Sequence, residues 1–307
     1  MRGQLTQVNS TDHRLGCVPM AVVVTLDGEV RDPDVPLLHA DDLAAVRGDG
    51  VFETLLVREG RPCLAEAHLA RLANSAAMLD LPAPDLVAWR AAIDKAAVEW
   101  SAQTQDEGAL RLVYSRGRES LSLPTAYVTV NPLAKRVYAA RRAGVKAVLL
   151  DRGLPVAGTD SMPWLLAGAK TLSYAVNMAA LRHAATLGAD EVIFVSSDGY
   201  ILEGPRSTVV IATDIDGKPG FLTPPPWYPI LRGTTQQALF EVARAEGYDC
   251  DLQPLRPADL FAAQGVWLIS AITLGARVHT LDGQSLPSSG LAREFAGMVD
   301  RAITAAR

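Results

Sequence analysis

The chain carries, near its middle, the stretch Gly168-Ala169-Lys170-Thr171-Leu172-Ser173-Tyr174, in which one lysine stands among small and apolar residues. Residues 172–187 follow with apolar side chains three and four positions apart, so they are predicted to form a helix. Desolvation disfavours the ammonium ion, so a lysine buried here would have a lowered pKa and a neutral amine able to attack an aldehyde. The alternative is a lysine whose ammonium reaches solvent from the start of that helix.

On both sides of this stretch, strand-like and helix-like segments follow one another irregularly. Strands are predicted over residues 20–25, 51–57, 109–115, 125–131, 191–196, 207–213 and 266–271. Helices are predicted over residues 68–81, 86–100, 172–187, 234–247 and 291–306. This order lacks a regular strand-helix-strand alternation, so it favours an α+β fold with mixed or antiparallel sheets over a doubly wound parallel sheet.

The length and composition fit a globular protein with two compact halves. The 307 residues are 49% apolar and 21% charged, which supports a sizeable core and exceeds what one small domain needs. A charged run over residues 135–142 interrupts the apolar pattern and marks the predicted boundary. The prediction is a flexible tail over residues 1–17, an N-terminal α+β domain over 18–134, a linker over 135–144 and a C-terminal α+β domain over 145–307.

Charge, cysteines and hydropathy exclude several classes of protein. The net charge of −5 is spread without a basic stripe, so no nucleic-acid partner is expected. Cys17, Cys63 and Cys250 are too far apart to indicate a disulfide framework or a metal site, and buried free thiols are expected. The polar start lacks the apolar core of a signal peptide, and no apolar run approaches the ~18 residues of a membrane span. We therefore expect a cytoplasmic protein without membrane contact.

The N-terminal half contains two motifs with possible chemistry. The run Gly48-Asp49-Gly50-Val51-Phe52-Glu53-Thr54-Leu55 lacks the third glycine or the lysine of a nucleotide-binding loop, so its glycines are predicted to form a tight turn into a strand. The run His68-Leu69-Ala70-Arg71-Leu72 places an arginine on a predicted helix. Its guanidinium could bind a phosphate through two parallel hydrogen bonds, although a lone helical arginine usually faces solvent.

Three more motifs lie in the C-terminal half. Glu203 stands in a run over residues 199–208 that begins Gly-Tyr-Ile-Leu. Leu231-Arg232-Gly233-Thr234-Thr235 opens a predicted helix, whose free N–H groups and threonine hydroxyls could bind a phosphate. Ordinary helix capping by Thr234 and Thr235 is the alternative. Ser270-Ala271 ends the last predicted strand.

In this order, over residues 22–278, the motifs resemble those of the class IV aminotransferase family, which has the two-domain fold type IV of D-amino-acid aminotransferases. The resemblance implies pyridoxal 5'-phosphate (PLP) as cofactor, a homodimer, and Lys170 as the residue that carries PLP as a Schiff base and acts in catalysis. It implies that Arg71 binds the cofactor phosphate and that Glu203 pairs with the pyridine nitrogen. Thr208 stands where the family usually has asparagine. The other cofactor-binding residues that the resemblance implies are Tyr174, Thr234, Thr235, Ser270 and Ala271.

Within the family, the sequence looks most like the 4-amino-4-deoxychorismate lyases, which form 4-aminobenzoate and pyruvate for folate biosynthesis. Tyr174 lies four residues after Lys170, as in the lyase and D-amino-acid branches. The element Ser115-Arg116-Gly117 is present, but the R-x-H that follows it in D-specific transaminases is not. The lyase substrate carries carboxylates, so the candidate substrate-binding residues are Arg111, Arg116 and Arg118, unless these arginines simply face solvent.

Two alternatives remain open at this point. One is a class IV aminotransferase acting on D-amino or branched-chain amino acids, because the same residues serve both reactions. The other is a non-catalytic binding protein on the same fold, against which the joint presence of Lys170, Arg71 and Glu203 speaks.

Overall fold

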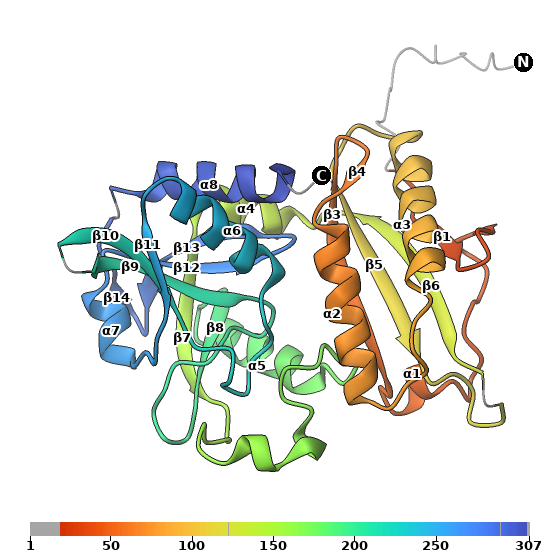
Figure 1. The fold of residues 1–307 in the computed structure, drawn as a ribbon, viewed down its shortest axis with the longest axis horizontal. Coiled ribbons are helices and arrows are strands. Elements are labelled where there is room, and N and C mark those ends of the chain that lie inside the picture. The colour runs from red at the N-terminus through yellow and green to blue at the C-terminus, as the bar shows by residue number, and fades with distance from the viewer. Residues whose placement is uncertain (1–18, 122, 216, 289, 306–307) are drawn as a thin grey trace, which may run out of the picture.

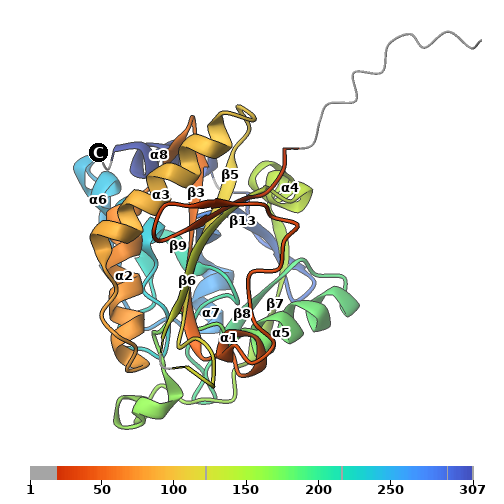
Figure 2. The same ribbon diagram turned by 90° about the vertical axis from the view of Figure 1, so that its right-hand side faces the viewer.

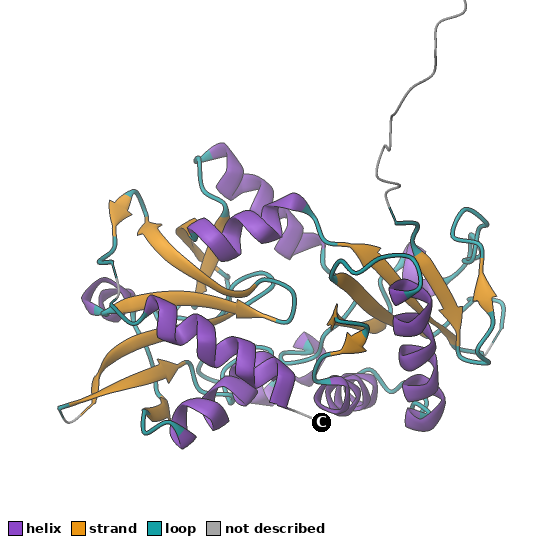
Figure 3. Ribbon diagram, turned by 90° about the horizontal axis from the view of Figure 1, so that it is seen from above, coloured by secondary structure: helices purple, strands orange, loops and turns teal. Residues whose placement is uncertain are grey.

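The computed structural model describes residues 19–121, 123–215, 217–288 and 290–305, and within them the chain builds two sheets that lie side by side (Figure 1). The predicted tail over residues 1–17, with Cys17, lies outside the described residues. The α+β fold with antiparallel and mixed sheets is confirmed. Seen from above, each half has its own sheet and its own helices (Figure 3).

The N-terminal sheet is entirely antiparallel, in the order β2-β1-β6-β5-β3-β4. The first of its hairpins turns at Asp27-Gly28. Helices α2 and α3 lie next to each other on one face of the sheet (Figure 2), where Leu72 and Trp89 pack against Val51 and Leu55. The elements of this half are β1 (Val22–Thr25), β2 (Val30–Arg31), α1 (Leu43–Val46), β3 (Gly50–Arg58), β4 (Arg61–Pro62), α2 (Ala65–Met78), α3 (Leu86–Ser101), β5 (Gly108–Ser115) and β6 (Thr125–Pro132).

The C-terminal sheet is mixed, in the order β11-β10-β9-β12-β13-β7-β8, with β14 paired to β13. The pairs β10–β11, β13–β7 and β7–β8 are parallel, and the other pairs are antiparallel. The strands are β7 (Val145–Asp151), β8 (Glu191–Val195), β9 (Thr208–Ile215), β10 (Lys218–Thr223), β11 (Asp249–Leu252), β12 (Gly265–Ser270), β13 (Leu274–Leu281) and β14 (Gln284–Ser285). The helices are α4 (Lys135–Ala143), α5 (Ala175–Thr186), α6 (Thr234–Ala245), α7 (Pro257–Ala262) and α8 (Ala292–Ala305).

The segment predicted as a linker is structured. Residues 135–143 form α4, in which Val137 is buried in the apolar cluster of the C-terminal sheet. That cluster also takes in Leu56 and Leu64 from the N-terminal half, beside Trp267 and Phe295. The two halves therefore share a core, and the domain boundaries proposed from the sequence stay a prediction.

The helix predicted from residue 172 begins only at Ala175, because the backbone of the preceding segment hydrogen-bonds to β3 instead. Cys63 and Cys250 are free and partly buried, and burial raises the pKa of each thiol to about 11. Within the described residues, none of the helices combines the length and the apolar character that a membrane span requires.

Candidate active site

The segment that carries Lys170 forms an extra piece of strand on the edge of the N-terminal sheet. Phe52 N–H donates to the Lys170 carbonyl (3.0 Å), Leu172 N–H donates to the Gly50 carbonyl (2.8 Å), and Thr171 lies opposite Val51. The pairing is antiparallel, so Lys170 lies directly opposite Phe52 and its side chain shares a face with that ring. A residue of the C-terminal half is thus fixed by the backbone of β3.

The glycines of the Gly48-Asp49-Gly50 turn permit this close approach. A Cβ on Gly50 would lie 2.7 Å from Ser115 Cα and 2.8 Å from Leu172 Cδ1. Gly48 has φ +66°, and a Cβ there would lie 2.8 Å from Ser173 Oγ. The predicted turn into β3 is confirmed, and it makes room for the segment that carries the lysine.

The Lys170 amine lies against two aromatic rings. Its Nζ is 4.4 Å from the centroid of the Phe52 ring and 5.4 Å from that of Tyr174, and the two rings meet edge to face. Burial, reinforced by the nearby Arg71 guanidinium, lowers the pKa of Lys170 to about 8. Burial also raises the pKa of Tyr174 to about 12, so its phenol keeps its proton. At pH 7 about one-tenth of Lys170 is therefore a neutral nucleophile, and the neutral fraction reaches about one-half near pH 8.

Glu203 lies between β8 and β9, where its Oε2 accepts a hydrogen bond from Leu231 N–H (3.0 Å). Burial raises the pKa of Glu203 to about 7, against the opposing effects of that hydrogen bond and of Lys170. The carboxyl can therefore exchange a proton near neutral pH. It belongs to the same buried group as Lys170, because each side chain influences the pKa of the other.

Arg71 is held by a buried carboxylate. Its Nε and Nη2 each donate to one oxygen of Glu53 (2.7 Å both), and its Nη1 donates to the Arg232 carbonyl (2.8 Å). Glu53 also contacts His68 Nδ1 (2.7 Å), and His68 Nε2 lies 3.3 Å from Thr234 Oγ1. Arg71 and His68 hold the pKa of Glu53 well below its usual range, although burial opposes them. The guanidinium is thereby positioned beside the loop that enters α6.

The N-terminus of α6 offers donors to an anion. Gly233, the residue before the helix, has no side chain that could cap it. The backbone N–H groups of Thr234 and Thr235 therefore have no side-chain cap. Thr235 Oγ1 is buried and has no hydrogen-bond partner within the described part of the chain. A negatively charged group is the natural partner for such a set of donors.

The predicted Ser270-Ala271 segment lies at the end of β12, near the start of α6. Ile269 pairs with Thr208, and a Cβ on Gly233 would collide with Thr208 Oγ1. Ser270 follows Ile269, whose partner Thr208 lies against Gly233 at the start of α6. Its Oγ accepts a hydrogen bond from Thr273 N–H (3.0 Å), which shapes the turn between β12 and β13.

The three candidate substrate-binding arginines have different environments. Arg116 donates to both oxygens of Asp49 (2.7 and 3.2 Å) and to the carbonyls of Leu79 and Asp80. Arg118 pairs with Asp41 (2.8 Å). Both guanidinium groups thus brace the loops around the Gly48-Asp49-Gly50 turn.

Arg111 is exposed and lies on the face of the sheet that carries Lys170. Arg111 lies opposite Thr54 of β3 on one side and opposite Thr129 of β6 on the other. Thr54 is two residues from Phe52 along β3. Side chains that are directly opposite in an antiparallel sheet share a face, and alternate residues along a strand do as well. Arg111 is therefore the one of the three whose position suits a ligand held near Lys170.

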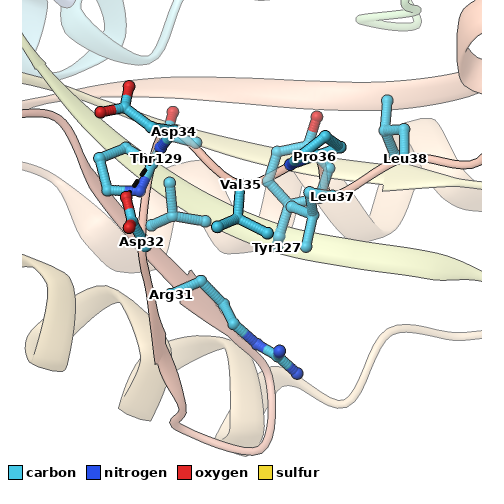
Figure 4. Close-up of a pocket in the computed structure, with 11 residues that line it drawn as sticks. Arg31, Asp32, Asp34, Val35, Pro36, Leu37, Leu38, Tyr127 and Thr129 are labelled. Carbon is cyan, nitrogen blue, oxygen red and sulfur yellow. Dashed lines mark hydrogen bonds between the residues drawn. The ribbon is translucent and has the colours of Figure 1, made fainter.

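A cavity of about 350 Å³ opens on this same face, between β6 and the loop after β2 (Figure 4). Thr129, the neighbour of Arg111, and Tyr127 form one wall, and Arg31 stands at its margin. The loop opposite is shaped by a hydrogen bond from Asp34 N–H to Asp32 Oδ1 (3.0 Å). Arg111 thus lies between the cavity and Lys170.

Sequence reasoning missed four residues of this site. Phe52 lies against the lysine, Ser75 Oγ accepts from Lys170 N–H (3.1 Å), and Glu53 and His68 position Arg71. A signal for Glu53 was present, because it occupies the inward position between Val51 and Leu55 of an apolar strand. A carboxylate at such a position must be paired, and His68 and Arg71 are three residues apart on one helix face.

Comparisons with known proteins agree with this geometry. The amino-transferase class IV family matches residues 50–281. A bifunctional aminodeoxychorismate lyase / D-amino acid transaminase from Mycobacterium tuberculosis is 69% identical over 289 residues, which are 93% of this chain and 100% of the relative.

Two solved structures have the same fold over nearly their whole length. One is the PLP-bound form of a hypothetical aminotransferase from Mycobacterium tuberculosis, with a TM-score of 0.91 and 69% identity over 93% of this chain and 100% of that one. The other is a fold IV transaminase from Curtobacterium pusillum, with a TM-score of 0.86 and 37% identity over 93% and 98% of the two chains.

Proposed function

Because the chain belongs to the amino-transferase class IV family of PLP-dependent enzymes, we propose that it is a 4-amino-4-deoxychorismate lyase that forms 4-aminobenzoate and pyruvate for folate biosynthesis. The observation that carries the proposal is the relative that shares 69% of its residues over its full length and is named for this lyase activity. The buried, partly neutral Lys170 supplies the base that the reaction needs.

The described residues fit PLP. Lys170 offers an amine to an aldehyde, and Thr235 Oγ1 is a buried hydroxyl without a partner at a helix N-terminus that suits a phosphate. Arg71 would also bind that phosphate, since its guanidinium donates to the Arg232 carbonyl just before α6. Glu203 would hold the ring nitrogen. Tyr174, Ser270 and Ala271 complete the proposed set of cofactor contacts.

When bound, PLP would withdraw electrons from the carbon that bears the substrate's amine. Lys170 would remove the proton from that carbon, and the pKa of about 8 that its surroundings give the free amine suits a group that accepts and returns a proton near neutral pH. Glu203 keeps a proton available at the opposite end of the site, since its own pKa is about 7. The C–O bond to the enolpyruvyl group would then break, the leaving group would take up a proton to become pyruvate, and the remaining ring would be aromatic.

We assign the recognition of a substrate carboxylate to Arg111. It lies on the Lys170 face of the sheet, between the lysine and the cavity beside Tyr127 and Thr129. Arg116 and Arg118 already pair with Asp49 and Asp41, so their role is to brace the loops.

The test is an assay of purified protein with 4-amino-4-deoxychorismate, in which 4-aminobenzoate and pyruvate should form in equal amounts. Lys170→Ala should abolish both products, whereas Lys95→Ala, which removes only an exposed pair with Glu99, should keep them. Turnover of amino-acid and keto-acid pairs without any 4-aminobenzoate would refute the lyase.

A second activity, transamination of D-amino acids, is supported by the same relative, whose name includes it. Lys170 and Glu203 serve both reactions, because only the later fate of the proton differs. A D-alanine and 2-oxoglutarate assay on the same preparation tests it.

We also propose a homodimer. Large apolar side chains are exposed around the loops next to Lys170, with Trp164 72% and Trp227 65% exposed, and α5 exposes Val176. A second copy would cover such a surface. Light scattering after gel filtration should give about twice the mass of the chain, and Trp164→Glu should reduce it. A wild-type mass equal to one chain would contradict the dimer.

A further inference from the structure

The two adjacent threonines at the start of α6 are bonded differently. Thr234 Oγ1 lies 3.3 Å from His68 Nε2, whereas Thr235 Oγ1 is buried without a partner among the described residues. His68 and Glu53 are both completely buried, so water cannot replace their mutual hydrogen bond of 2.7 Å. The sequence gives no reason to distinguish the two hydroxyls.

The positions of the protons in this group follow from its contacts. Glu53 is an ionised carboxylate that faces the Arg71 guanidinium through both oxygens, so it can only accept hydrogen bonds. His68 Nδ1 must therefore carry the proton of the Glu53–His68 bond. Burial lowers the pKa of His68 although the Glu53 carboxylate opposes it, and the nearby Arg71 acts in the same direction as burial, so the ring is neutral and carries no second proton. Its Nε2 is then an acceptor.

A hydroxyl has one hydrogen to give, and Thr234 must direct it to His68 Nε2. We propose that Glu53 and His68 are positioning residues that turn the Thr234 hydroxyl away from the anion site, so that Thr235 alone of the two donates its hydroxyl hydrogen to the phosphate of the cofactor. This inference rests on the proposed PLP enzyme, since the phosphate is the cofactor's.

The same contacts connect the two sides of the anion site. Arg71 and the start of α6 belong to different halves of the molecule, and the line Arg71–Glu53–His68–Thr234 joins them through side chains. A second contact, from Arg71 Nη1 to the Arg232 carbonyl, runs parallel to it. The guanidinium and the helix N-terminus are thus held in place before a phosphate arrives, which reduces the ordering cost of binding.

The first experiment observes the proton directly. Nitrogen-15 NMR of histidine-labelled, PLP-loaded protein should show one of the five histidines as the neutral tautomer with its proton on Nδ1, without titration between about pH 6 and pH 8. The signal should vanish in His68→Gln. A His68 signal from the Nε2–H tautomer, or from a doubly protonated ring, would overturn the proposal.

The second experiment compares PLP affinities by absorbance titration of matched variants. Thr235→Val should weaken binding about tenfold or more, as expected for the loss of a hydrogen bond to a charged group. Thr234→Val should weaken it by less than about threefold, and Thr234→Ser should restore the wild-type value. Equal losses in the two valine variants, or a larger loss at Thr234, would contradict the assignment. Circular dichroism of each variant guards against misfolding.

A double-mutant cycle between His68→Gln and Thr234→Val checks the link between these residues. Their effects on PLP affinity should be non-additive, because both break the same bond. Additive effects would count against the proposed hydrogen-bond relay from Glu53 through His68 to Thr234. These readouts are independent of turnover. Wild-type protein that binds PLP with this pattern but forms no 4-aminobenzoate would sink the proposed function and leave the relay intact.

Discussion

Lys170 has its chemical character because of its surroundings. An exposed lysine would be charged at neutral pH, but burial and the Arg71 guanidinium oppose the charge. The two rings of Phe52 and Tyr174 keep water from the amine on two sides. The reactivity of one residue thus depends on contacts from both halves of the molecule.

A pH dependence follows for the uptake of PLP by the apo-protein. Only the neutral amine attacks an aldehyde, and its population grows as pH rises through the folded pKa of about 8. The rate of formation of the visible absorbance band should therefore rise with pH to a plateau, with a midpoint near that value. Stopped-flow absorbance from about pH 6 to pH 10 measures it. A midpoint near the ordinary lysine pKa would show that the amine is not buried in this way.

Glu203 should lower the stability of the apo-protein at high pH. Its pKa is raised in the fold from 4.5 to about 7, so the folded state binds the proton more tightly than the unfolded state does. Stability is therefore lost as pH rises through that window, and the loss is complete above it. Glu203→Gln should raise the free energy of unfolding by about 1–3 kcal/mol at pH 8 and by much less near pH 5.

Urea denaturation at the two pH values measures this difference. The exposed Glu119→Gln serves as the control and should change little at either pH. The same Glu203 variant should lose activity, so a gain in stability would accompany a loss of function. Equal stability of Glu203→Gln and wild type at high pH would contradict the assigned burial.

At the scale of elements, the decisive contact is between β3 and the segment that carries Lys170. Gly50 is the tightest point of this contact, so Gly50→Ala should push Leu172 and Ser115 apart. We expect a loss of about 1–3 kcal/mol in the free energy of unfolding, together with weaker PLP binding, because Lys170 moves with the segment. Thermal unfolding and PLP titration measure the two effects.

Gly290→Ala is the matched control for that experiment. A Cβ on Gly290 meets nothing within 4 Å, so the substitution should be neutral. A stable Gly50→Ala protein with normal PLP affinity would mean that the lysine segment is not held by this packing.

Local sequence pattern predicted the long elements well. The strand β3 and the helices α2, α3, α6 and α8 were recognised from their apolar spacing, and Gly247, where the fourth predicted helix was expected to end, follows α6 with a positive φ. The pattern missed β10, whose Lys-Pro-Gly start resembles a turn, and the short helix α7. Such segments take their form from the strands beside them, and their own residues carry little signal.

The site was only partly predictable for the same reason. The motif residues Lys170, Arg71 and Glu203 could be selected from the sequence, and the structure places them around one region. The pairing of Lys170 with Phe52 joins residues far apart in the chain, so no local rule gives its register. Arg116 could face a substrate or a carboxylate of its own chain, and only the tertiary structure shows that it pairs with Asp49.

At the scale of the whole molecule, a charged network joins the two halves beside their shared apolar cluster. Glu107, the residue just before β5, accepts from Arg58 of β3 (2.6 Å) and from Arg141 of α4. Arg58 also reaches Asp300 of α8 (3.0 Å), and Arg141 donates to the Ile272 carbonyl. One carboxylate therefore connects elements from both halves.

Removing that carboxylate should loosen the junction. Glu107→Gln leaves the partly buried Arg141 without its charge partner and Arg58 with only the exposed Asp300, so the free energy of unfolding should fall by about 1–3 kcal/mol. Glu66→Gln, which breaks an exposed pair with Arg90, should change it by less than about 1 kcal/mol. Urea denaturation compares them, and equal effects would show that the network does not hold the halves together.

The extended pairing of residues 170–172 with β3 also bears on how the chain folds and where it is vulnerable. At Gly50–Phe52, β3 is an outer strand, and its backbone groups are satisfied by a segment synthesised long after it. Until the C-terminal half arrives, a nascent N-terminal sheet would present an open hydrogen-bonding edge, which is a site of aggregation. A fragment that ends before α4 should therefore be prone to self-association. The segment that carries Lys170 therefore also prevents this edge of the sheet from pairing with the same edge of another copy of the chain.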